Sequence, residues 1–105
     1  MKVIFNDDKK IIDITTPGGN TVSLNEDDKS IRIQDINGNK IVLGKDGITI
    51  ESIKDFTLKA ANDIKNEGNN INVKGAAQTK VEGAAGVELS SGATTIVKGS
   101  TVMLN

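Results

Sequence analysis

The chain lacks several residue types on which most enzymes and small secreted domains depend. Its 105 residues include no Cys, His, Trp or Tyr. The absence of Cys excludes a disulfide framework and thiol chemistry, and the absence of His removes the commonest general base and zinc ligand. Phe5 and Phe56 are the only aromatic residues, so a thick globular core is not expected. We therefore expect neither an enzyme nor a bound cofactor.

Neither sign of charge is in excess, and no long apolar run is present. Thirteen basic residues face 14 acidic ones, a net charge of −1, so nothing draws the chain to nucleic acid or to an acidic membrane. No apolar run approaches the roughly 20 residues that a membrane-spanning helix needs. The apolar start, Met1–Phe5, runs at once into Asn6, Asp7 and Asp8, which is not the pattern of a signal peptide.

What the chain does contain is a repeat of aliphatic pairs, in which one outward residue separates two inward ones. From Ile48 onward these pairs start seven or eight residues apart. Such alternation is typical of short strands with one buried face. We predict that the core consists of Ile48, Ile50, Phe56, Leu58, Ile64, Ile71, Val73, Val81, Val87, Leu89 and Val97.

Small residues recur in register between these strands, two positions after an inward residue. They are Gly75, Gly83, Ser91 and Gly99. Glycine at such a place permits a sharp corner where a side chain would clash. The alternative to strands is a helix over residues 54–65, a stretch with few helix-breaking residues.

The first half repeats the pattern more loosely. Its pairs, which start nine or ten residues apart, are Ile12/Ile14, Val22/Leu24, Ile31/Ile33 and Ile41/Leu43. Turn-forming residues connect them, which indicates hairpins or wider corners. Within one connection, Asp35–Asn39 resembles the start of a calcium loop, but a plain hairpin turn is the better interpretation. We therefore divide the chain into an N-terminal strand and turn region, 1–47, and an octad-repeat needle, 48–105.

A single chain cannot bury the apolar faces of these strands. Complete burial of two side chains contributes on the order of 3–5 kcal/mol per strand, whereas ordering eight residues costs roughly 8–16 kcal/mol of backbone entropy. Three copies wound about one axis would bury the faces and pair the strand edges. We therefore predict an all-β fold, an intertwined trimeric, triple-stranded β-helix with octad repeats and looser N-terminal strands. The alternative is a monomeric β-solenoid.

Several runs carry a resemblance to a known family. The run Val73–Gly75 and its octad equivalents at Val81–Gly83 and Val97–Gly99 are similar to the repeat of the central spike protein of contractile phage tails. The chain also resembles, along essentially its whole length, the C-terminal spike of VgrG proteins of type VI secretion systems. The runs that carry this second resemblance are 14–21, 36–41, 47–52 and 97–105.

The resemblance implies a structural, cell-puncturing spike that acts by stiffness. It implies a homotrimer with a conical PAAR-type tip protein at its C-terminal end, sometimes an effector there, and transient contact with the target membrane. It also implies a preceding hub, not present in this sequence, through which the spike meets the tail-tube protein. Such a spike is assembled in the cytoplasm and then injected outward.

Two exposed apolar residues near the C-terminus suggest where a tip protein would dock. Ile96 and Met103 are outward positions of the repeat, and apolar groups clustered at one end are typical of a docking surface. The predicted tip-binding residues are Ile96, Val102, Met103, Leu104 and Asn105. A shifted register that buries Ile96 and Met103 is the alternative. For the whole chain, the alternative function is a trimeric fibre or adhesin stalk that acts as a binding module.

Overall fold

The computed structural model describes all 105 residues, and β-strands are its only regular secondary structure. Six antiparallel strands form one sheet and no helix is present, which confirms the all-β class and excludes the helix considered over 54–65. The strands are β1 (Lys2–Asn6), β2 (Ile11–Thr15), β3 (Thr21–Asn25), β4 (Ser30–Gln34), β5 (Lys40–Gly44) and β6 (Gly47–Glu51). The chain divides into two compact units, residues 1–64 and 65–105.

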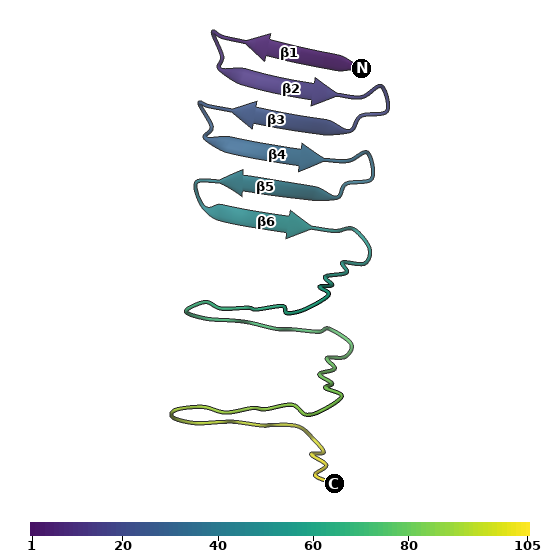
Figure 1. Ribbon diagram of the computed structural model, residues 1–105, viewed down its shortest axis with the longest axis vertical. Coiled ribbons are helices and arrows are strands. Elements are labelled where there is room, and N and C mark those ends of the chain that lie inside the picture. The colour runs from purple at the N-terminus through teal and green to yellow at the C-terminus, as the bar shows by residue number, and fades with distance from the viewer. The chain divides into compact units, whose positions relative to one another are not determined.

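The sheet is a simple meander in which each strand pairs with the next one along the chain (Figure 1). Every strand has five residues, and most of the strands are rich in Ile, Val and Thr, which favour extended backbone. The connections are short hairpin turns, as the spacing of the first half indicates. Ile48 and Ile50, which we predicted to begin the octad region, lie in β6 and pair antiparallel with β5.

The register brings the predicted apolar pairs of the first half onto one face. Opposite residues share a face of a sheet, and neighbours along a strand point to opposite faces. The pairing therefore forms two rows of six apolar side chains, which we call the apolar face. The rows are Val3, Ile14, Val22, Ile33, Ile41 and Ile50, and Phe5, Ile12, Leu24, Ile31, Leu43 and Ile48.

The turns along one edge of the sheet repeat after nineteen residues. Asn6 Oδ1 accepts a hydrogen bond from the backbone N–H of Lys9 at 3.0 Å, and Asn25 Oδ1 accepts one from Asp28 at 3.0 Å. An Asn that bonds its own backbone in this way closes a tight turn. Each of the two turns therefore repeats the other's geometry.

The opposite edge carries a second repeated turn, in which side chains link one turn to the next. Asn20 Oδ1 accepts a hydrogen bond from the backbone N–H of Ile36 at 3.1 Å, and Asn39 Oδ1 accepts one from Ile53 at 2.9 Å. The position equivalent to Ile36 in the first such turn is Pro17, which has no N–H to satisfy. Pro17 therefore leaves no backbone donor without a partner at this position.

Residues 65–105 are extended and bend at small residues, without forming a strand ladder. An added Cβ at Gly75 would collide with the carbonyl of Gln78, and one at Gly83 with the carbonyl of Gly86. These two corners therefore require glycine, as the repeat predicts. No backbone–backbone hydrogen bond joins any two residues of this unit.

Candidate subunit interface

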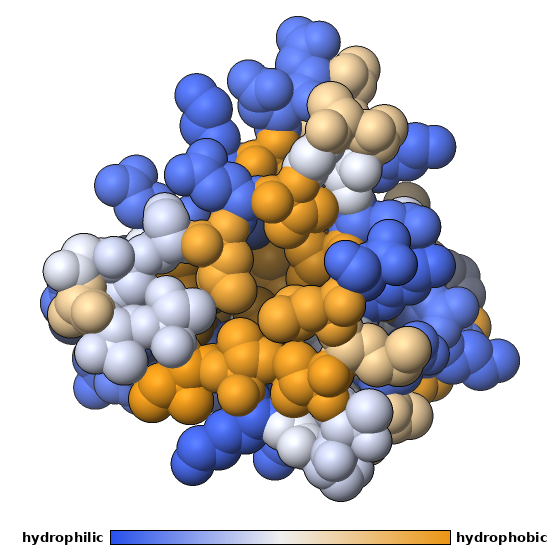
Figure 2. Space-filling model, turned by 90° about the horizontal axis from the view of Figure 1, so that it is seen from below, coloured by the Kyte–Doolittle hydropathy of each residue, from blue (hydrophilic) through white to orange (hydrophobic).

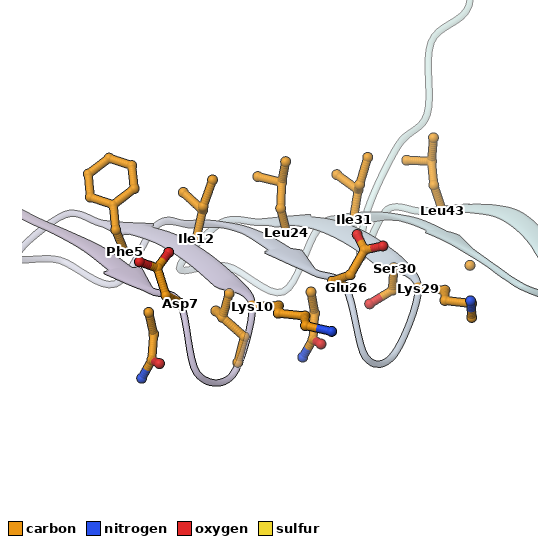
Figure 3. Close-up of a pocket in the computed structure, with 14 residues that line it drawn as sticks. Phe5, Asp7, Lys10, Ile12, Leu24, Glu26, Lys29, Ser30, Ile31 and Leu43 are labelled. Atoms are coloured by element: carbon orange, nitrogen blue, oxygen red, sulfur yellow. The ribbon is translucent and has the colours of Figure 1, made fainter.

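The apolar face is the most conspicuous surface of unit 1–64. Phe5, Ile12, Leu24, Ile31 and Leu43, one from each of five successive strands, point to the same side of the sheet and line an open depression (Figure 3). Strands β2 to β5 contribute Ile or Leu side chains of similar bulk, and the register places these side chains opposite one another. The face is a continuous apolar surface with no polar side chain in its rows.

Nothing in the chain covers this face. No side chain of the protein is buried; the exposed fraction is 73% for Phe5 and still 37% for Ile12 near the middle of the sheet. The chain as a whole exposes 10173 Å², whereas a compact monomer of 11.1 kDa exposes about 5,700 Å². A strand whose apolar face stays in water is unstable, so this surface needs a partner.

The other face of the sheet is mainly polar. Asp13, Ser23 and Arg32 form the middle of one of its rows, which Ile4 and Val42 extend. At the edge of this face Lys40 Nζ lies 3.3 Å from Glu51 Oε2. Antiparallel sheets with one apolar and one hydrated face normally pack on one side only. Because one face is apolar and the other is mainly polar, we expect copies of the chain to associate through the apolar face.

The remaining predicted core residues lie beyond the sheet and are all exposed. Phe56, Leu58 and Ile64 follow β6 within the first unit. Those of the second unit are Ile71, Val73, Val81, Val87, Leu89 and Val97. In the space-filling view, hydrophobic residues are open on the surface that faces the viewer (Figure 2). Burial of these side chains depends on other copies and stays a prediction.

The predicted docking residues at the C-terminus are exposed as well. Met103 is 88% exposed and Leu104 is 92% exposed, and Ile96 and Val102 are also open to solvent. Asn105 is exposed at the end of the chain. The structure leaves these side chains accessible to a partner, and their role in docking stays a prediction.

The environment of Asp35 changes its proton affinity. Asn39 Nδ2 donates to Asp35 Oδ2 at 2.8 Å, and the backbone N–H groups of Asn37 and Asn39 donate to Oδ1 at 2.9 Å each. The side-chain amide of Asn39 is the main reason that the pKa of Asp35 lies below its ordinary value of 3.8, while partial burial opposes the shift. The carboxylate is used to close a hairpin turn, which supports that interpretation over a calcium loop.

No cluster of three or more His, Cys, Asp or Glu side chains is placed to hold a metal ion. The chain also forms no helix that is long and apolar enough to cross a bilayer.

Our reading of the sequence missed the role of Asn20 and Asn39. A signal was present, since Gly19-Asn20 and Gly38-Asn39 stand nineteen residues apart, as do Lys10 and Lys29. Our prediction rested mainly on the aliphatic pairs, which start nine or ten residues apart. Two such intervals together make up the nineteen-residue repeat. The polar repeat is therefore the better guide to the paired strands of the sheet.

Comparison with known proteins adds no assignment. No protein-family model matches the chain. No curated protein matches its sequence significantly.

Proposed function

We propose that this chain is one of three identical subunits of a structural, cell-puncturing spike of a contractile injection machine. The observation that carries the proposal is the apolar face, two rows of six side chains that the chain itself does not cover. Three copies that turn these faces toward a common axis bury them together. The resemblance to VgrG spikes supports the same arrangement.

The second unit supports association around an axis rather than between two flat sheets. Its extended backbone makes no backbone–backbone hydrogen bond within the unit, and unpaired backbone groups are costly unless another strand or water satisfies them. Corners at Gly75 and Gly83, eight residues apart, turn the chain at regular intervals. Strands of other copies that lie between its successive passes would complete the backbone pairing.

Stiffness is the proposed mechanism. In the trimer, the strands are hydrogen-bonded to their neighbours, the interior is filled by aliphatic side chains, and long loops are absent. A contracting sheath drives such a needle forward, and the needle transmits force without buckling. No single residue performs this function; the inward aliphatic side chains and the glycine corners perform it together.

The C-terminal end is the proposed attachment point for a conical tip protein. Ile96, Val102, Met103 and Leu104 offer apolar contact area there, and a tip protein would cover it. In some machines of this kind, an effector is carried at the same end. At the other end, a hub domain would connect the spike to the tail tube.

The decisive experiment is a mass measurement in solution. Light scattering coupled to size exclusion should give three times the chain mass of 11.1 kDa, with a β-sheet circular dichroism spectrum. A folded species with the mass of one chain would refute the proposal, and a mass of two chains would replace the three-fold arrangement by a sheet-on-sheet dimer. Electron microscopy of the trimer should then show slender particles.

A further inference from the structure

We infer that the N-terminal sheet aligns the three chains and thereby selects the register in which their C-terminal repeats join. The inference rests on the proposed trimer. It assigns to residues 1–51 a role in assembly beyond that of a stiff segment. Three observations carry it: the similarity of the octads, the lack of pairing within residues 65–105, and the resistance of the sheet to slippage.

The octads by themselves define their register weakly. If one chain slides by eight residues relative to another, Val81 takes the place of Leu89, and the glycine corner at Gly75 takes the place of Gly83. Inward positions still meet inward positions, and only the terminal octads lose their partners. Repetitive strands whose faces match after a shift are prone to slip.

The second unit also cannot form before the chains meet. Its backbone donors and acceptors have no backbone partner within residues 65–105, so an isolated chain gains little from ordering it. In the sheet, by contrast, every strand pairs with its neighbour in the sequence. Such local antiparallel pairs form quickly, so in the associating chains the sheet is expected to become ordered before residues 65–105.

The sheet resists slippage because successive strands run in opposite directions. If one chain shifted by one strand relative to another, each of its strands would lie beside a strand that runs in the direction opposite to that of its correct neighbour. A shift by two strands leaves two of the six strands, and so four of the twelve apolar side chains, without partners. It would also place Phe5, the only aromatic residue of the apolar face, at the level of Leu24. The sheet therefore discriminates between registers that the octads tolerate.

Cysteine cross-linking tests the register directly, because the chain has no cysteine of its own. Val81→Cys and Val97→Cys chains are mixed in equal amounts, unfolded, refolded together and oxidised. In the correct register the two positions are two octads apart, about 10 Å along the axis, which is too far for a disulfide. Only same-position disulfides, 81–81 and 97–97, are then expected, and an 81–97 disulfide reports a chain that has slipped by two octads, the distance that corresponds to two strands of the sheet.

The register is next challenged by truncating one side chain of the apolar face. Ile50→Ala in both chains should raise the 81–97 product about tenfold or more, because Ile50 lies in β6, one of the strands that lose their partners on slipping, and its truncation removes much of the energy difference between registers. Thr49→Ala, on the neighbouring residue of the other face, is the matched control and should leave the product at the wild-type level. An unchanged 81–97 fraction in Ile50→Ala trimers, or an equal rise with Thr49→Ala, would overturn the inference.

The order of folding provides a second test that needs no variant. Pulsed hydrogen exchange during refolding of the full chain should show protection of residues 11–51 before residues 65–105. Earlier or simultaneous protection of residues 65–105 would contradict the inference. The light-scattering mass separates the two proposals. A monomer would refute both of them. A trimer in which residues 65–105 fold first would refute only the alignment role of the sheet.

Discussion

The side-chain oxygen of Asn39 accepts a hydrogen bond from the backbone N–H of Ile53, fourteen residues further along the chain, at 2.9 Å. Asn20 does the same for Ile36 at 3.1 Å. Each asparagine belongs to a turn at the end of a strand, and each bond reaches the turn that follows along the same edge of the sheet. These bonds stabilise the edge where β-strand pairing alone leaves backbone N–H groups without partners.

Asn39→Ala should therefore destabilise the protein by about 1–3 kcal/mol, because the Ile53 N–H and one oxygen of Asp35 lose their partner. Urea unfolding at a fixed protein concentration measures the change. Asn62→Ala is the control, since Asn62 is exposed and makes no hydrogen bond within the chain; its effect should stay within about 0.5 kcal/mol. Equal effects of the two substitutions would show that the turn-to-turn bond contributes nothing.

Asp35 should make the stability depend on pH in acid. Its pKa is lower in the folded chain than in the unfolded chain, chiefly because of the Asn39 amide. The stabilisation is therefore present above the ordinary value of 3.8 and is lost as the pH falls through the lower, folded-state value. Thermal unfolding between pH 2 and 7 should show the wild type losing its advantage over Asp35→Asn below about pH 4. A constant difference across this range would contradict the assignment.

Lys29 has a φ of 53°, and its equivalent Lys10 a φ of 55°. A side chain in this left-handed region is strained, and glycine relieves the strain. Lys29→Gly should therefore raise the free energy of unfolding by about 0.5–1 kcal/mol. Lys9→Gly, at a position without positive φ, should instead lower it by a similar amount. Denaturant midpoints of the two variants should move in opposite directions, and a loss of stability in Lys29→Gly would refute the argument.

The two glycines of the run 83–86 should respond very differently to substitution. A Cβ at Gly83 would collide with the carbonyl of Gly86 and lie 3.1 Å from Val87 Cγ2, whereas a Cβ at Gly86 meets nothing within 4 Å. Gly83→Ala should cost about 2 kcal/mol or more, because backbone must move. Gly86→Ala should change stability by less than about 1 kcal/mol. Melting temperatures of the assembled protein measure both, and similar values would show that the corner is not tightly constrained.

Removal of the apolar end should separate docking from assembly. The double substitution Met103→Asp and Leu104→Asp should weaken binding of a conical tip protein about 100-fold or more, since charges replace apolar contact area. The mass of the trimer should be unchanged, because these residues follow the last complete octad. Glu88→Lys, an outward change within the repeat, is the control and should leave tip binding intact. Undiminished binding by the double variant would place the docking site elsewhere.

The apolar pairs of the first half could be predicted from the sequence. The spacing of Ile12/Ile14, Val22/Leu24, Ile31/Ile33 and Ile41/Leu43 predicted strands with one apolar face, and the register of the sheet confirms that these residues share a face. Alternation in a strand is a local property, so the sequence alone reveals it. The corners at Gly75 and Gly83 were predictable for the same reason, since each depends on a few neighbouring residues.

Other features depend on residues that are distant in the sequence. The hydrogen bonds from Ile36 to Asn20 and from Ile53 to Asn39 cross 16 and 14 residues, and no local pattern indicates which N–H an asparagine will reach. The depressed pKa of Asp35 likewise depends on how the turn folds back on its carboxylate. Ile48 and Ile50, at the start of the predicted octad region, pair with Leu43 and Ile41 of β5, and side-chain spacing does not report which backbone groups pair.

By itself, the sequence determined that this protein is built of short strands with one apolar side, that its corners need small residues, and that His and Cys chemistry is absent. Only the tertiary structure decided which segments pair within one chain and which are left without partners: residues 2–51 form a continuous antiparallel ladder, and residues 65–105 form none. The physical reason is that the alternation of side chains is a property of the local sequence, whereas the hydrogen bonds of the backbone depend on which strand lies alongside.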